Sequence, residues 1–128
     1  MDRPRVFTGA PWEKQFGYCR AIRAGSWVCV SGTAPVDPDG STHAPGDMHA
    51  QARRCLAIAL GAMGELGAGP EHVVRTRMFV TDIGRSGEVG RAHGEVFGAA
   101  PPATTLVEVT ALIAPDMLIE VELDALLP

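Results

Sequence analysis

The sequence has little lysine, no block of basic residues and no long hydrophobic run. Lys14 is the only lysine in 128 residues, and the formal net charge is −4. An acidic chain without a basic cluster is a poor match for a phosphate backbone, so we expect no nucleic-acid partner. Met1 is followed by three charged residues and one proline over residues 2–5, with no apolar run behind them, and from this we expect no signal peptide, no membrane span and a cytoplasmic location.

Several motifs that carry chemistry are also missing. The three cysteines, Cys19, Cys29 and Cys55, form no CxxC pair and stand in apolar surroundings, which favours buried thiols over redox or nucleophilic roles. The histidines show no metal-ligand spacing, and the chain contains no GxGxxG, Walker or serine-elbow pattern. We therefore expect chemistry without a metal or an organic cofactor.

What is present is the composition of an ordinary globular protein. Hydrophobic residues make up 46% of the chain and charged residues 20%. A chain of this length buries about two-thirds of its unfolded surface in a single core, so we expect one domain over residues 1–128.

Five β-rich runs and two helical repeats are separated by glycine and proline. Gly25 marks a hairpin turn, the proline-rich residues 33–46 form a loop, and Asp47 caps the first helix. The predicted strands are Tyr18–Ala24, Ser26–Gly32, Val73–Thr81, Thr105–Ala111 and Leu118–Leu126, and the predicted helices are 47–67 and Arg85–Phe97.

This order, β-β-α-β-α-β-β, predicts an α+β fold in which two helices cover one face of a mixed sheet. The last strand indicates which face is covered, because apolar residues alternate with acids along it. Its apolar set is Ile119, Val121 and Leu123, and its acidic set is Glu120, Glu122 and Asp124. We expect the second face of the sheet to be acidic.

The segment PPATTLVEV, residues 101–109, places two small hydroxyls beside a hydrophobic run. Its two prolines end the preceding helix, and Leu106, Val107 and Val109 predict a buried strand. Thr104 and Thr105 at the start of this strand are candidates for hydrogen bonds to a neutral ligand.

Three longer stretches resemble the Rid family, also called the YjgF family, of imine deaminases. They are FGYCRAIRAGSWVCVSGTAPVD, QARRCLAIALGAMGELGAGPEHVVRTRMFVTDI and PPATTLVEVTALIAPDMLIEVELDA, and together they span nearly the whole chain. The resemblance implies a chorismate-mutase-like fold and a homotrimer with small-molecule clefts between its subunits. Some family members carry an endoribonuclease label, which the acidic charge of this chain argues against.

The resemblance also implies a catalytic glutamate without its usual partner. In the deaminase branch, the arginine of a PARS segment clamps the carboxylate of a 2-imino acid, and a glutamate of the last strand handles the water. Here the arginine position is Thr104, and the glutamate matches Glu120. A carboxylate left unpaired in a dehydrated cleft costs about 3 to 5 kcal/mol, so we expect weak or no activity on 2-iminopropanoate or 2-aminoacrylate.

Further residues are expected at the cleft. Arg20 follows Tyr18 by two residues, so on a strand both side chains share a face, and Arg20 is a candidate replacement clamp. A solvated arginine or an interface ion pair stays open as an alternative for Arg20, as do a packing role for His93 and an exposed strand acid for Glu120. The expected substrate-binding residues are Tyr18, Arg20, Ser31, Gly32, Thr33, His93, Thr104 and Thr105.

Two classes of function follow from these residues. The first is a cofactor-independent hydrolase or deaminase that acts on an imine, enamine or related C–N bond of a metabolite other than the usual 2-imino acids. The second is a non-catalytic homotrimer that binds a small molecule or serves a pathway as an accessory protein. A retained Glu120 favours the first class.

Overall fold

The computed structural model describes residues 2–128, in which six strands form one sheet of order β1-β2-β3-β6-β4-β5. The pairing of β4 with β5 is parallel, whereas the other neighbours are antiparallel. The strands are β1 (Arg5–Val6), β2 (Ala21–Ala24), β3 (Trp27–Thr33), β4 (Val73–Val80), β5 (Ala103–Glu108) and β6 (Ile119–Leu126).

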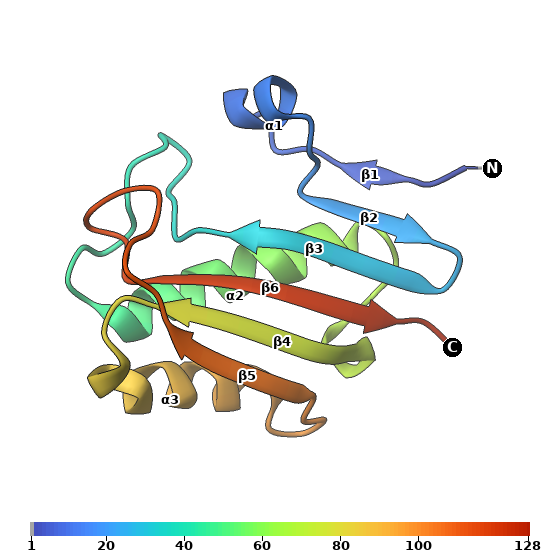
Figure 1. The fold of residues 1–128 in the computed structure, drawn as a ribbon. Helices are drawn as coiled ribbons and strands as arrows, with labels where there is room; N and C mark the ends of the chain where they lie inside the picture. Colours follow the sequence, from blue (N-terminus) through green and yellow to red (C-terminus); the bar gives the residue numbers. More distant parts are fainter. Residues whose placement is uncertain (1) are drawn as a thin grey trace.

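The two long helices, α2 (Met48–Gly64) and α3 (Ser86–Phe97), lie side by side behind one face of the sheet (Figure 1). A short helix, α1 (Pro11–Phe16), stands apart beyond the β1–β2 edge, and 3₁₀ turns occupy Pro70–His72 and Ile83–Arg85. Across residues 2–128, no helix combines the length and apolarity needed to cross a membrane.

The core lies between the sheet and these two helices, as the alternation in the last strand predicts. Ile119, Val121 and Leu123 of β6 are at most 1% exposed and face α2 and α3, whereas the acids between them lie on the opposite face. Cys55 of α2 is fully buried, and burial raises the pKa of its thiol. Cys19 and Cys29 are only half-buried, so the prediction of buried thiols is confirmed for Cys55 alone.

The local signals for turns and caps are confirmed. The side chain of Asp47 accepts a hydrogen bond of 3.0 Å from the Ala50 N–H and so caps α2. Gly25 has a φ of 61° at the hairpin between β2 and β3, a backbone conformation that favours glycine.

The N-terminal segment differs from the prediction, because β1 and α1 lie where no element was expected. Tyr18 was predicted to begin a strand, but β2 begins at Ala21. The reason is that the N–H groups of Gly17 and Tyr18 both donate to the carbonyl of Glu13, which closes α1 instead of joining the sheet.

The strand after the two prolines also differs. β5 is an edge strand that starts at Ala103, two residues earlier than predicted, and its residues are exposed except for the half-buried Leu106, so the prediction of a buried strand is wrong. The sheet face away from the helices is not simply acidic either. Arg77 of β4 lies between Glu122 and Asp124 of β6, with an N–O distance of 3.3 Å to each.

Candidate functional site

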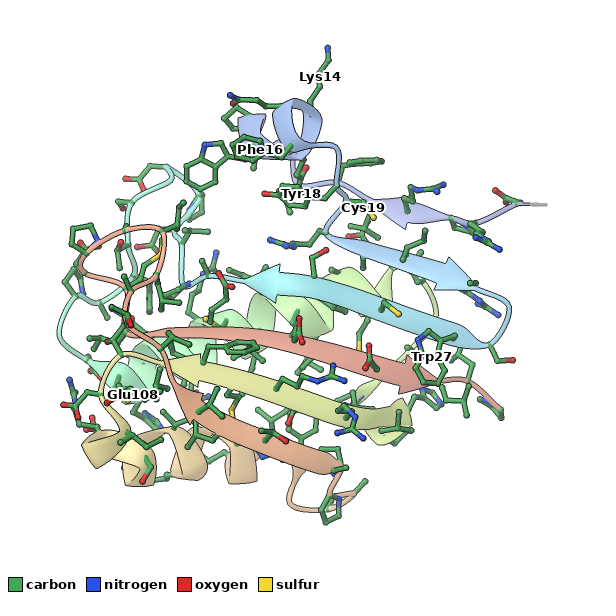
Figure 2. The ribbon with its side chains drawn as sticks, viewed as in Figure 1. Lys14, Phe16, Tyr18, Cys19, Trp27 and Glu108 are labelled. Carbon is green, nitrogen blue, oxygen red and sulfur yellow. The ribbon has the colours of Figure 1, made fainter. Side chains whose placement is uncertain are left out.

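A cleft of about 820 Å³ lies where α1 and the loop after β3 meet the ends of β3 and β6. In Figure 2, Phe16 and Tyr18 lie between α1 and the sheet, while Lys14 points away from the molecule. Five of the predicted site residues line this cleft: Tyr18, Arg20, Gly32, Thr33 and Glu120.

Glu120 is half-buried, and it is placed by β6, where it pairs with Phe79 of β4. Its carboxylate makes no hydrogen bond to any group within residues 2–128. Burial raises the pKa of Glu120 above its ordinary value of 4.5, against the lowering influence of the Arg20 cation, and the nearby charge of Glu122 adds to the rise. This carboxyl therefore holds a proton at a higher pH than an exposed glutamate does.

Gly32 provides the space that the Glu120 side chain occupies. A Cβ atom on Gly32 would lie 2.8 Å from Glu120 Oε2, which is closer than carbon atoms approach oxygen in proteins. The pairing of β3 with β6 is irregular between Val30 and Thr33, so the Gly32 backbone departs from the regular ladder at this point. The close approach explains why a glycine stands beside the glutamate.

Arg20 spans the floor of the cleft. Its Nη2 donates to the carbonyl of Gly32 at 2.6 Å, and its guanidinium carbon lies 5.7 Å from the centre of the Tyr18 ring. Its Nε is buried and has no hydrogen-bond partner within residues 2–128. Neither Arg20 nor Tyr18 lies in a strand, so the alternation argument for this pair is wrong, although the two side chains do meet.

The hydroxyls of the SGT turn are used by the local backbone. Ser31 Oγ donates to the carbonyl of Cys19 at 2.7 Å, and Thr33 Oγ1 donates to the carbonyl of Ser31 at 2.8 Å. The first of these bonds ties β3 to the segment that carries Arg20, and the second lies within β3. Thr33 lines the cleft but is only 1% exposed, which limits it to a supporting position.

His93 and Thr104 form a separate cluster near the other edge of the sheet. The Oγ1 of the buried Thr76 lies 2.9 Å from His93 Nε2 and 2.8 Å from Thr104 Oγ1, and Thr104 Oγ1 lies 3.3 Å from His93 Nε2. Burial lowers the pKa of His93. Within one chain, this cluster and Thr105, which pairs with Arg77, lie outside the cleft that holds Glu120.

The sequence interpretation missed the aromatic wall of the cleft. Trp12 and Phe16, four residues apart on α1, both line it, and their i, i+4 spacing was a readable signal. Ile113, which is 64% exposed, contributes from the loop before β6.

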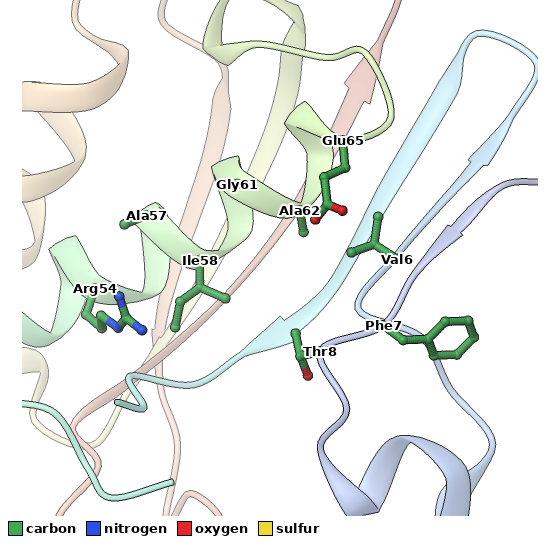
Figure 3. A pocket seen from close by; sticks show the side chains of 9 residues that line it. All are labelled: Val6, Phe7, Thr8, Arg54, Ala57, Ile58, Gly61, Ala62 and Glu65. Carbon is green, nitrogen blue, oxygen red and sulfur yellow. The ribbon is translucent and has the colours of Figure 1, made fainter. Parts of the chain in front are cut away.

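A second groove of about 500 Å³ adjoins the cleft along α2. Figure 3 shows Arg54 and Ile58 projecting from the helix, with Thr8 across from them on the N-terminal segment. All three residues also line the larger cleft, so the two hollows are continuous. Within the described residues, no three histidine, cysteine, aspartate or glutamate side chains gather closely enough to hold a metal ion.

Comparison with known proteins adds to this geometry. Residues 10–127 match the family model described as Endoribonuclease L-PSP. The crystal structure of Rv2704 from Mycobacterium tuberculosis, a member of the YjgF/YER057c/UK114 family, superposes with a TM-score of 0.90 at 44% identity over 98% of this chain and 100% of that one. This likeness confirms the predicted chorismate-mutase-like fold.

Two curated relatives extend the comparison. The RutC family protein PYRAB12510 of Pyrococcus abyssi is 31% identical over 122 residues, which is 95% of both chains. The 2-iminobutanoate/2-iminopropanoate deaminase of Salmonella typhimurium is 33% identical over 108 residues, which is 82% of this chain and 83% of that protein.

Proposed function

The chain belongs to the Rid/YjgF family, and on that premise we propose that it is a cofactor-independent hydrolase or deaminase of an imine, enamine or related C–N bond. Its substrate is a small metabolite other than the usual 2-imino acids. A deaminase-named relative at 33% identity supports the reaction class, and the residues of the cleft support the change of substrate.

The observation that carries the proposal is a glutamate with a raised pKa and free oxygens on the floor of a cleft. Glu120 has Arg20 and Gly32 beside it, and burial raises its pKa. A carboxyl that titrates closer to neutral pH exchanges protons with substrate and water more efficiently than an ordinary one. Strand acids that are fully solvated have no such property.

Hydrolysis of a C=N bond needs a proton at nitrogen and a water at carbon. In the proposed reaction, Glu120 takes a proton from the attacking water as the C–O bond forms and passes it to the imine nitrogen. The hydroxyl proton of the resulting carbinolamine then passes through Glu120 to the nitrogen as the C–N bond breaks, so the nitrogen leaves as ammonia and the carbon becomes a carbonyl. Atoms balance as imine plus water giving carbonyl plus ammonia.

The absence of a clamp for a carboxylate supports a neutral substrate. The residue at the arginine position of the deaminase branch is Thr104, whose hydroxyl is within hydrogen-bond distance of Thr76 and His93. Two cations line the cleft, and each already binds a backbone carbonyl: Arg20 binds that of Gly32 and lies over the Tyr18 ring, and Arg54 binds that of Val36. A threonine hydroxyl does not replace a guanidinium charge.

The proposal includes assembly as a homotrimer with clefts between subunits. His93, Thr104 and Thr105 lie outside the cleft of their own chain, and a second copy would bring them to it. Val107 of β5, on the sheet face away from the helices, is 40% exposed and offers apolar surface for such a contact. Light scattering would then report three times the chain mass of 13.5 kDa.

Ammonia release from two matched imines tests the proposal. One imine is 2-iminopropanoate, formed in situ from alanine by an amino-acid oxidase, and the other is neutral propanaldimine, formed from propylamine by an amine oxidase. We expect acceleration of the neutral imine and a rate at least about a hundredfold lower for the carboxylated one. Turnover of both at similar rates would overturn the substrate assignment and point to Arg20 as a clamp.

If the protein accelerates ammonia release from neither imine, the hydrolase proposal is contradicted. The alternative, a trimer that binds a small metabolite or serves a pathway as an accessory protein, would then be favoured. The hydrogen-bonded Thr104 hydroxyl is compatible with either function, whereas a carboxyl with a raised pKa favours the catalytic one.

A further inference from the structure

We propose that the cleft selects a substrate with an aromatic ring attached to the C–N carbon. This inference deepens the proposed function and rests on it. It is carried by the helix α1, which adds aromatic side chains to a cleft whose floor holds Glu120 and Arg20.

The aromatic side chains come from one face of α1 and from the residue just beyond it. Trp12 and Phe16 are separated by four residues, so they lie one above the other on the same face of the helix. Tyr18 follows the helix end, and its ring lies against the Arg20 guanidinium. Trp12 and Phe16 are 44% and 67% exposed, so the ring faces available to a ligand are extensive.

The helix that carries this wall is held in place by a buried carboxylate. Glu13 is 4% exposed and accepts hydrogen bonds from the Thr8 N–H at 3.0 Å, the Gly9 N–H at 3.1 Å and the Thr8 hydroxyl at 2.6 Å. Charge-assisted bonds of this kind are about twice as strong as neutral ones. A six-residue helix anchored in this way presents Trp12 and Phe16 in fixed positions.

Aliphatic side chains from three other segments also line the cleft. Ile58 projects from α2, Ile113 from the loop before β6, and Val36 from the loop after β3. Ligand cavities of about 300 to 1,000 Å³ suit drug-sized molecules, and the cleft of about 820 Å³ falls in that range. A three-carbon imine would leave most of this apolar surface in contact with water, whereas an aryl group would cover it.

Binding of stable amides tests the inference without requiring turnover. Benzamide and acetamide have the planar, neutral C–N group of the proposed substrates and differ by the ring. We expect calorimetry to show benzamide binding at least about tenfold more tightly than acetamide, because ring burial and stacking contribute more than 1.4 kcal/mol. Equal affinities would overturn the inference.

Trp12→Ala is the variant to compare, and Trp27→Ala is its matched control. The two tryptophans have nearly equal exposure, 44% and 42%. Figure 2 shows Trp27 at the far end of the sheet from Phe16 and Tyr18, where it pairs with Leu126. We expect Trp12→Ala to lose about tenfold in benzamide affinity and none in acetamide affinity, and Trp27→Ala to change neither.

Phe16→Ala is a second test in case Trp12→Ala does not fold. Phe16 is 67% exposed, so its side chain contributes little to folding. If both α1 variants keep the wild-type circular dichroism and the wild-type affinity for benzamide, the aromatic wall does not bind the ring and the inference is wrong. Loss of benzamide affinity in Phe16→Ala alone would still support it.

Turnover separates this inference from the proposed function. Benzaldimine, formed in situ from benzylamine, is compared with propanaldimine in the ammonia assay. A preference of about tenfold for benzaldimine that Trp12→Ala removes supports both proposals. Equal turnover of the two imines sustains the proposed function and overturns the aromatic preference. Benzamide binding without turnover of either imine sustains the aromatic site and overturns the hydrolase.

Discussion

Two glutamates near the same cleft differ in their hydrogen bonds and in the direction of their pKa shifts: Glu13 is buried beside the cleft, and Glu120 is half-buried on its floor. Glu13 anchors α1 and accepts hydrogen bonds from Thr8 and Gly9, and these bonds, helped by the Arg20 charge, outweigh the effect of burial and lower its pKa. The Glu120 carboxylate has no hydrogen bond within residues 2–128, and burial raises its pKa.

The difference shows how a fold assigns roles to identical side chains. The hydrogen bonds from Thr8 and Gly9 stabilise the charged form of Glu13, so this carboxylate holds the 8–9 loop and takes up a proton less readily. Gly32 leaves room for the carboxylate oxygens of Glu120. The charge of Arg20 favours the ionised form of this carboxylate, but no hydrogen bond within residues 2–128 does. We assign the structural role to the first and the proposed catalytic role to the second.

The largest expected effect follows from Glu120→Gln. An amide cannot exchange the proton that imine hydrolysis requires, so the rate of ammonia release from the neutral imine should fall at least about a hundredfold. Glu122→Gln is the matched control, because Glu122 lies two residues along the same strand face and pairs with Arg77 outside the cleft. Equal losses in both variants would contradict the role of Glu120.

Glu13→Gln should reduce the free energy of unfolding by about 1 to 2 kcal/mol, because its charge-assisted bonds to the 8–9 loop are weakened. This loss is small for charge-assisted hydrogen bonds, because the Glu13 side chain is covered but lies near the molecular surface. Urea denaturation at pH 7 measures the loss. The exposed Glu71→Gln is the control and should change the free energy by less than about 0.5 kcal/mol.

Gly32→Ala tests how Glu120 is positioned. The added Cβ would displace the Glu120 tip, which is flexible, so we expect about a tenfold loss of activity with a smaller change in stability. Gly64→Ala on α2 is the control, since its added methyl meets open space and the substitution favours the helix. Full activity of Gly32→Ala would show that the close approach has no functional consequence.

The smallest expected effect is an opposite pH dependence of stability in two variants. Because the folded-state pKa of Glu120 is raised, the wild type loses stability relative to Glu120→Gln as pH rises through 4.5 towards that pKa. The pKa of Glu13 is lowered, so its contribution is present above 4.5 and is lost as pH falls through the folded-state value. Urea midpoints at about pH 3 and pH 7 measure both differences, and trends of equal sign would contradict the assignment.

Much of the fold could be predicted because its signals are local. The cap at Asp47, the turn at Gly25 and the alternation of β6 each depend on neighbours in the chain. The helix α1 escaped prediction because its six residues hold only one i, i+4 pair of aromatic residues, Trp12 and Phe16, and its anchor at Glu13 depends on contacts with Thr8 and Gly9.

The candidate site was predictable only in part, for the same reason. The family motif pointed to Glu120, which lines the cleft, but the orientation of Thr104 depends on the parallel pairing of β5 with β4, which sets it beside the buried Thr76. The exposure of β5 could not be predicted either, because it depends on the position of this strand at the edge of the sheet. The side chains of Arg20 and Tyr18 lie together because Tyr18 is held at the end of α1. Alternation along a strand, from which the contact was predicted, is not the cause.

That Glu120 is the carboxyl free to exchange a proton in the cleft is tested most directly by its titration. Carbon-13 NMR of the glutamate carboxyls, assigned with Glu13→Gln and Glu120→Gln, follows both groups in one sample. We predict a Glu120 midpoint above 4.5 and a Glu13 midpoint below it. Coincident midpoints, or the reverse order, would contradict the account.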